Sequence, residues 1–165
     1  RGEEKPAWPS KFTADFQPQL LARTKEVAQG RELDLQLVDA RPTSYFVGQV
    51  KSSSARSAGT IPGALSIPDQ LFLEKGEGGA WFFEPQRVAT VIEQSDLDTN
   101  APVATFCNTG TWAASDWFAL SEILGMKNIS LYDGSMAAWT ADNNLPVQVT
   151  KAGRKSISTP AAIGN

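Results

Sequence analysis

Two patterns of apolar and polar residues follow one another along most of the chain. Apolar runs with the length of buried strands, several of them ending in polar residues, occur at 35–38, 64–67, 102–107 and 129–132. Apolar residues that recur three and four positions apart predict helices at 18–30, 84–94, 112–125 and 134–143. Since strands that alternate with helices favour a parallel sheet, we expect an α/β fold with a central parallel sheet and helices on both faces.

The first predicted helix and two predicted loops complete this outline. One face of helix 18–30 carries Leu20, Leu21, Thr24, Val27 and Ala28, and Gly30 follows as a stop signal. The Ser-rich segment 50–59 predicts a surface loop, and a Gly-rich turn near 76–79 separates two apolar patches. Helices and strands are therefore predicted for the middle of the chain and not for its two ends.

The domain organisation follows from the length and from the ends. A chain of 165 residues is long enough to bury one ordinary core. Residues 1–11 mix charge and proline without periodicity, and the segment from about 149 to 165 shows none either. We expect an N-terminal arm at 1–11, one domain at 12–148 and a C-terminal tail at 149–165.

Charge and hydropathy narrow the function classes. The formal net charge is -3 with a sequence pI near 5.0, which disfavours nucleic-acid binding because a basic surface is absent. The longest apolar runs are too short to cross a bilayer, so no membrane association is expected. We expect no cofactor. The chain begins with Arg1 and polar residues, which suggests a removed leader or a fragment.

The counts of cysteine and histidine restrict the chemistry further. The chain has one Cys and no His. An intrachain disulfide is excluded, and a zinc site is disfavoured because zinc rarely accepts carboxylates alone. The same counts exclude Ser-His-Asp and Cys-His pairs within the chain, because no imidazole is present as a base. Any nucleophile must therefore be activated without histidine.

Cys107 stands where a strand is predicted to end and a helix to begin, in the loop CNTGTW. Gly110 allows an unusual backbone turn there, so that backbone N–H groups of the loop and of the helix start can point at the sulfur. Such a cradle favours a thiolate without any histidine. The competing interpretation, a small buried core cysteine, stays open on this context alone.

The segment CNTGTWAASDWFALSEILGMKNISLYDGSMAAW resembles the active-site half of a rhodanese domain. In that family a Cys-headed loop opens a helix, and a Leu-Gly pair leads to a strand, a Gly-containing turn and a Trp. Upstream, LVDAR and GTIPGALSIP resemble the first central strand and the Gly-His-Ile-Pro-Gly-Ala segment of the family. The resemblance covers about Phe12 to Val147.

The resemblance implies a sulfurtransferase in which Cys107 is the catalytic nucleophile. Its thiolate attacks the outer sulfur of a donor such as thiosulfate and forms a persulfide, which passes its sulfur to a thiol or a cyanide-like acceptor. Backbone N–H groups from Asn108 to Trp112, Gly110 included, would hold the persulfide, with the Thr109 and Thr111 hydroxyls as further donors. Trp112 is a candidate wall of the pocket, with simple packing over the helix start as the equal alternative.

The sequence departs from the family in its charges and histidines. Many thiosulfate-using members carry Arg or Lys in the loop, and this loop has neither. Arg56 and Arg41 are the candidate cations, although an ordinary ion pair is the more common role of such residues. Asp39 and Arg41 are expected to be structural near the site. Thr111 and Thr60 stand where relatives often carry His, so the resemblance implies a reduced activity.

Partners, compartment and alternatives follow from the same resemblance. The CNTG-x-W loop is similar to a subgroup of tandem, exported bacterial rhodaneses, which suggests a periplasmic location, with the cytoplasm as the alternative. It also suggests a second rhodanese domain or a protein acceptor. A related phosphatase is disfavoured because Trp112 and Ala113 stand where the clamping Arg would fall. The main alternative function is a non-catalytic or sulfur-carrying module that binds a protein partner.

Overall fold

A computed structural model describes residues 11, 13–30 and 32–149. Of the predicted arm at 1–11 only Lys11 lies within this part, and of the predicted tail at 149–165 only Val149 does. The predictions for both ends therefore fall almost wholly outside the described residues. Within the described part, no helix is long and apolar enough to cross a membrane.

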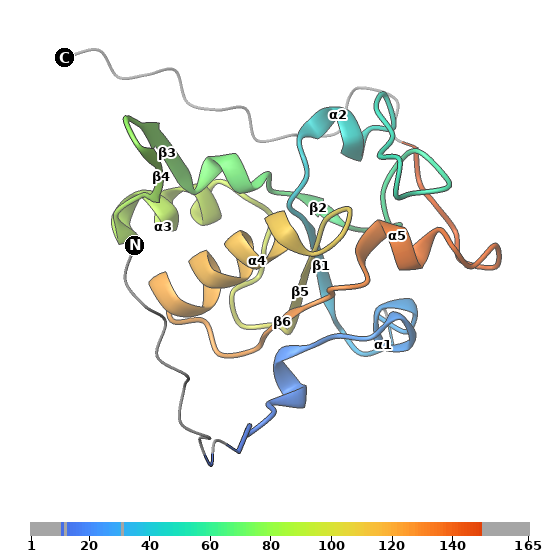
Figure 1. Ribbon diagram of the computed structural model, residues 1–165, viewed down its shortest axis with the longest axis horizontal. Helices are drawn as coiled ribbons and strands as arrows, with labels where there is room; N and C mark the ends of the chain where they lie inside the picture. Colours follow the sequence, from blue (N-terminus) through green and yellow to red (C-terminus); the bar gives the residue numbers. More distant parts are fainter. Residues whose placement is uncertain (1–10, 12, 31, 150–165) are drawn as a thin grey trace, which may run out of the picture.

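The centre of the molecule is a parallel sheet in the order β2-β1-β5-β6 (Figure 1). Its strands are β1 (Gln36–Asp39), β2 (Leu65–Ser66), β5 (Val103–Phe106) and β6 (Ile129–Leu131). In the register of the sheet Asp39 lies opposite Ser66 on one side and Phe106 on the other. The carboxyl ends of three strands thus meet at one edge, the place where open parallel sheets bind ligands.

Two layers of helices cover the two faces of the sheet. One face packs against α3 (Pro85–Glu93), α4 (Thr111–Phe118) with its π-helical continuation η3 (Ala119–Ile123), and the turn η2 (Asp69–Leu71). The other face packs against α1 (Thr24–Ala28) and α5 (Ser135–Trp139). Alternate strand residues divide between the layers: Val38 and Val103 face the first, whereas Leu37 and Ala104 face the second. The predicted fold class is confirmed.

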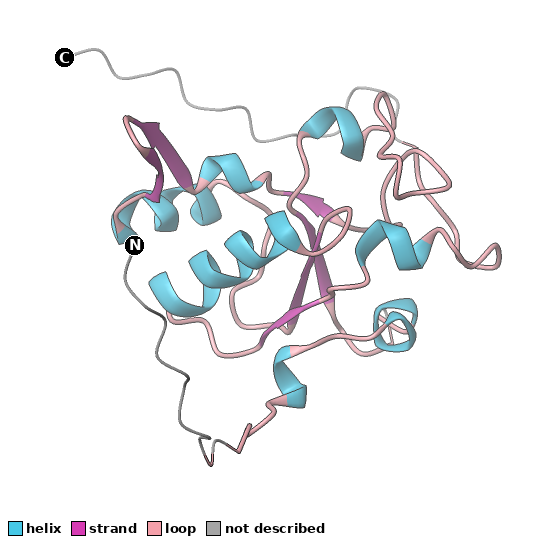
Figure 2. Cartoon of the chain, in the orientation of Figure 1, coloured by secondary structure: helices cyan, strands magenta, loops and turns pink. Residues whose placement is uncertain are grey.

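The Gly-rich turn between apolar patches forms a hairpin of its own. Strands β3 (Leu73–Gly76) and β4 (Gly79–Phe82) pair antiparallel and stand apart from the central sheet (Figure 2). Trp81 on this hairpin is half exposed. A short helix that the apolar pattern does not predict, α2 (Thr43–Phe46), follows β1.

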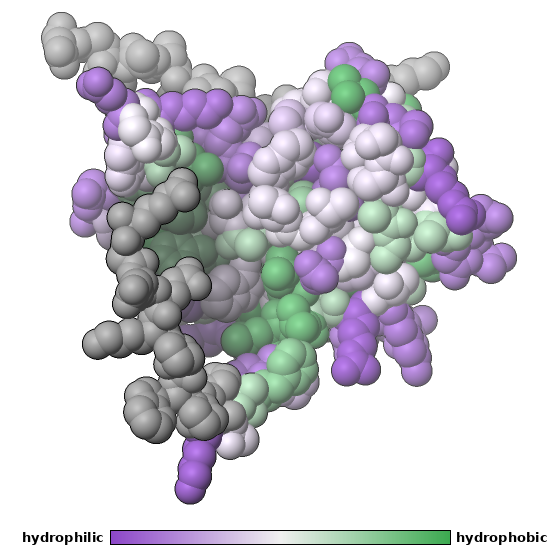
Figure 3. All heavy atoms as spheres, in the orientation of Figure 1, coloured by the Kyte–Doolittle hydropathy of each residue, from purple (hydrophilic) through white to green (hydrophobic). Residues whose placement is uncertain are grey.

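The prediction of one continuous helix at 18–30 is wrong. A 3-10 turn, η1 (Pro18–Leu20), is followed by an extended residue, Leu21, which pairs with Leu131 beside the sheet. A shorter helix, α1, then begins after Arg23, whose backbone N–H donates to Glu26 at 2.7 Å. The bridge to β6 and this cap together interrupt a pattern that is helical by spacing alone. In the space-filling view, apolar residues gather low on the face where η1 and β6 lie (Figure 3).

Candidate active site

Cys107 follows the last residue of β5 and is only 2% exposed. Its backbone N–H donates to the Ser135 hydroxyl at 3.0 Å, and its carbonyl accepts the Met136 N–H at 3.1 Å. The Asn108 carbonyl accepts the Ala137 N–H at 3.1 Å. The first turn of α5 therefore holds the start of the cysteine loop by both its side chain and its backbone.

Gly110 aims a backbone amide at the sulfur. Its N–H donates to the Cys107 Sγ at 3.1 Å, and its φ of 92° lies in the left-handed region that favours glycine. A Cβ at this position would stand 2.5 Å from the Asp133 Oδ1, so a side chain here would require the exposed Asp133 carboxylate to move. Among the amides expected to surround the sulfur, that of Gly110 is the one with a direct hydrogen bond.

Arg41 and Asp39 form a buried ion pair beside this loop. The guanidinium donates to both carboxylate oxygens, from Nε at 2.8 Å and from Nη2 at 2.6 Å. Nη2 also donates to the Gly59 carbonyl at 2.8 Å, and Thr60 donates to the Asp39 Oδ2 at 2.7 Å. The Nη1 of Arg41 reaches the Asn108 Oδ1 at 3.5 Å. The pair ties the strand end to the Ser-rich loop and, more weakly, to the cysteine loop.

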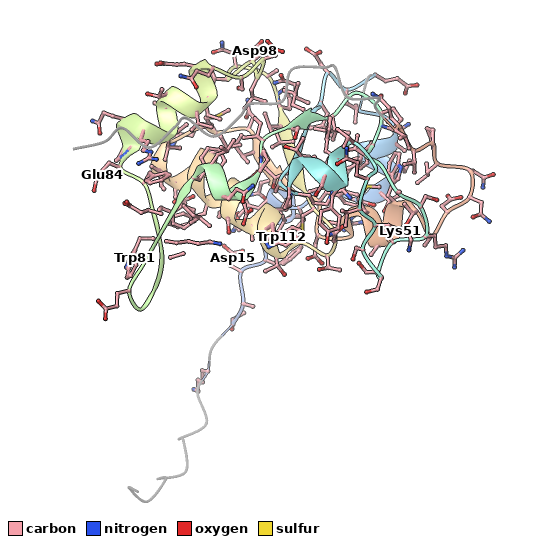
Figure 4. The ribbon with its side chains drawn as sticks, turned by 90° about the horizontal axis from the view of Figure 1, so that it is seen from above. Asp15, Lys51, Trp81, Glu84, Asp98 and Trp112 are labelled. Atoms are coloured by element: carbon pink, nitrogen blue, oxygen red, sulfur yellow. The ribbon has the colours of Figure 1, made fainter. Side chains whose placement is uncertain are left out.

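An aromatic side chain covers the buried cluster around the sulfur. Cys107, Ala40 and Ala113 form this cluster, and half-buried Trp112 packs against it. The Trp112 ring meets the Tyr45 ring of α2 edge-on, with centroids 6.0 Å apart. In Figure 4 the labelled Trp112 lies near the middle of the molecule beside α2. The arrangement fits both functions expected of Trp112, a pocket wall and packing at the helix start.

The other candidate side chains differ in exposure. Thr109 and Thr111 are exposed at the loop surface, whereas Asn108 is buried. Arg56 is exposed, and its backbone N–H donates to Thr140 at the carboxyl end of α5, away from the end that holds Cys107. Within the described part of the chain, the Arg56 side chain has no hydrogen bond or ion pair, and no cluster of residues could hold a metal ion.

Asp116 is an unexpected acidic neighbour of this site. It lies one helical turn beyond Ala113 on the same face of α4, is fully buried, and neither of its carboxylate oxygens has a hydrogen-bond partner among the described residues. Burial raises the pKa of Asp116 well above its ordinary value, and the negative charges of Asp69, Asp39 and Cys107 raise it further. A buried carboxyl in such surroundings is held as the neutral acid.

Sequence reasoning missed Asp116, Ser135 and Tyr45 as parts of the site. A signal existed for Asp116, because positions 113, 116, 117 and 120 share one helical face and all others on it are apolar. Ser135 has a φ of 49° and its hydroxyl binds the Cys107 N–H and the Tyr132 carbonyl, but no local pattern in the sequence indicates it. Tyr45 meets Trp112 from a helix that the pattern does not predict.

These features define a class of protein, an α/β domain with a cysteine site at the carboxyl edge of its sheet, where a strand–loop–helix junction presents a buried cysteine to a loop amide. A family model, described as Rhodanese-like domain, matches residues 23–142. The chain therefore belongs to the rhodanese-like family.

Curated relatives of this chain are sulfurtransferases. The 3-mercaptopyruvate sulfurtransferase of Escherichia coli K12 is 29% identical over 142 residues, which cover 85% of this chain and 49% of that protein. The thiosulfate/3-mercaptopyruvate sulfurtransferase 2 of Arabidopsis thaliana is 28% identical over 141 residues, covering 84% and 40%. The chain thus spans half or less of the length of these relatives. In this part of its length it is similar to enzymes that are named sulfurtransferases.

Solved structures share the fold. The Tum1 protein of Saccharomyces cerevisiae superposes with a TM-score of 0.70 at 23% identity, over 82% of this chain and 49% of that one. An anaerobic ergothioneine biosynthesis enzyme of Chlorobium limicola gives a TM-score of 0.66 at 22% identity, over 79% and 32%. At these identities the likeness extends to the fold alone.

Ser135→Ala tests the support of the cysteine loop. The change removes the acceptor of the buried Cys107 N–H and the donor to the Tyr132 carbonyl. The Tyr132 carbonyl keeps the backbone N–H of residue 135 as a donor, but the buried Cys107 N–H is left without a partner, so the free energy of unfolding in urea should fall by about 1–3 kcal/mol. Ser121→Ala, which removes an exposed hydroxyl bound to Glu122, is the matched control. Equal effects of the two substitutions would contradict a supporting role for Ser135.

Proposed function

We propose that this domain transfers sulfane sulfur through a persulfide on Cys107. The observation that carries the proposal is the hydrogen bond from the Gly110 N–H to the Cys107 Sγ, at a loop that opens a helix. Such an amide stabilises negative charge on the sulfur, which is the charge of both a thiolate and a persulfide anion. No histidine is required, in agreement with the absence of histidine from the chain.

The reaction has two steps. With thiosulfate as donor, the Cys107 thiolate attacks the outer sulfur, the new S–S bond forms on the protein, and sulfite leaves with the electron pair of the broken bond. An acceptor such as a thiolate or cyanide then attacks the outer sulfur of the persulfide, and the electron pair returns to Cys107 as the thiolate. Asn108, Thr109, Gly110, Thr111 and Trp112 bound the space in which the outer sulfur would lie.

Intact mass spectrometry tests this proposal. The protein is incubated with thiosulfate or, separately, with a small thiol hydropersulfide, and the expected result is a gain of one sulfur, about 32 Da, which cyanide removes. The Cys107→Ser variant should gain nothing under the same conditions. A wild-type protein that gains no sulfur from either donor would leave the alternative, a rhodanese-like module that binds a partner without chemistry.

The compartment and the partner are part of the same proposal. The likeness of the CNTG-x-W loop to exported bacterial rhodaneses supports a periplasmic location and a protein acceptor or second rhodanese domain as partner. Fractionation of cells that produce the natural full-length protein would test the location, and recovery in the cytoplasmic fraction would overturn it.

A further inference from the structure

An inorganic dianion such as thiosulfate needs positive charge near the sulfur, and the residues of this site do not supply it. The loop 107–112 contains no Lys or Arg. The nearby Arg41 has its charge balanced by Asp39, in the one ion pair among the described side chains, and its Nη2 is also bound to the Gly59 carbonyl. Its guanidinium therefore offers no uncompensated positive charge to an incoming donor.

One acidic side chain lies against the cysteine loop, and the backbone of a second acidic residue lies beside the cluster that contains the sulfur. Asp133, in the turn between β6 and α5, is exposed and places its Oδ1 against Gly110, whose amide binds the Cys107 Sγ. Asp69 of η2 is half-buried and lies at the end of β1, with its N–H bound to the Ala40 carbonyl at 2.9 Å. Burial raises the pKa of Asp69, while a hydrogen bond from the Gln70 backbone and the charge of Lys75 on the hairpin act in the opposite direction.

The walls of the site suit an organic group. Trp112 packs on the cluster of Ala40, Cys107 and Ala113, and its ring is braced by Tyr45, over which the Arg41 guanidinium lies 5.9 Å from the centroid. Aromatic faces attract both apolar groups and cations. A donor that carries its sulfur on a carbon skeleton can contact these rings, whereas thiosulfate has no such group.

We propose that the site takes sulfur from an organic hydropersulfide whose carrier has an uncharged or cationic head, and that it discriminates against thiosulfate and other anionic donors. The inference rests on the proposed function, since it names the donor class for the same cysteine. The Cys107 thiolate attacks the outer, protonated sulfur of the donor, and the S–S bond to the carrier breaks. The carrier leaves as a thiolate with that electron pair, and the outer sulfur keeps its proton on Cys107.

Two donors of equal length and opposite head charge test the proposal. The hydropersulfides of cysteamine and of 2-mercaptoethanesulfonate share a two-carbon skeleton and differ in an ammonium against a sulfonate. Each loading rate, measured by the gain of one sulfur in intact mass, is divided by the rate of the same donor with a small free thiol. The corrected rate should be on the order of tenfold higher for the ammonium donor at low salt. Thiosulfate loading should be slow and should accelerate as salt screens the repulsion.

Asp133→Asn is the variant that isolates the charge at the loop. The substitution keeps the size of the side chain. It should reduce the preference for the ammonium donor several-fold and raise the rate of loading from thiosulfate by a similar factor. Asp98→Asn is the matched control, because Asp98 is exposed and its backbone binds the Gln36 side chain at the amino ends of β1 and β5, the opposite end of the sheet from Cys107. Figure 4 shows Asp98 at the far edge of the molecule from Trp112.

The outcomes separate this inference from the function on which it rests. Equal or faster loading from the sulfonate donor, or thiosulfate loading that slows as salt is added, overturns the charge preference while sulfur transfer stands. If loading from the sulfonate donor or from thiosulfate is also lost in the Arg56→Ala variant, the exposed Arg56 is a donor-binding cation, which again overturns the preference. Absence of sulfur gain from every donor overturns the proposed function itself.

Discussion

Replacing Arg41 by alanine should lower the free energy of unfolding by about 3–5 kcal/mol, because it leaves the Asp39 carboxylate buried without its counter-charge. The substitution also removes the donor to the Gly59 carbonyl, which connects the strand end to the Ser-rich loop. Urea denaturation followed by tryptophan fluorescence measures the change. This loss is large, since the total free energy of unfolding of a domain of this size is only about 5–15 kcal/mol.

Two further variants separate the charge effect from the loss of an arginine side chain. Arg56→Ala removes an exposed arginine and should change the unfolding free energy by no more than about 0.5 kcal/mol. The double variant Asp39→Asn with Arg41→Ala removes both charges and should recover part of the stability lost by Arg41→Ala alone. A double variant less stable than the single one would show that the unpaired carboxylate is not the cause.

Replacing Gly110 by alanine should reduce the rate of sulfur loading by about 100-fold, the size of effect that small misplacements of a reacting group produce. The φ of 92° strains any residue other than glycine, and the new Cβ would also displace the exposed Asp133 side chain, so we expect the Gly110 amide to shift away from the Cys107 Sγ. Loading is measured by intact mass with the donor that reacts fastest with the wild type.

Gly63→Ala is the matched control for this prediction. Gly63 has a φ of 87°, close to that of Gly110, but a Cβ there meets nothing within 4 Å. Gly63→Ala should therefore lower the free energy of unfolding by about 1–2 kcal/mol through backbone strain and leave the loading rate unchanged. If Gly63→Ala and Gly110→Ala slow loading equally, a general loss of stability explains the effect and the amide at the sulfur does not.

Local patterns in the sequence were sufficient to predict the fold and the position of the cysteine at the end of a strand. Strand and helix periods are properties of neighbouring residues, and so the strands of the central sheet and the helices at 85–93 and 111–118 were predictable from spacing. The absence of histidine and the single Cys107 limited the chemistry to a nucleophile that works without an imidazole base. The error at 18–30 arose because a bridge between Leu21 and Leu131 overrides a helical pattern, and such a bridge is not visible in local spacing.

The sequence by itself determined the family of this domain and the residue proposed as its nucleophile, because both depend on residues that are neighbours along the chain. Only the tertiary structure decided the surroundings of Cys107: the hydroxyl of Ser135, the carboxylate of Asp133, the ring of Tyr45 and the neutralised charge of Arg41. Arg41 and Asp39 are close in the sequence, but their burial beside the loop depends on the packing of β1 against β5. The charge that a donor meets at the sulfur is therefore set by contacts between distant segments, since electrostatic interactions depend on distance and burial in space.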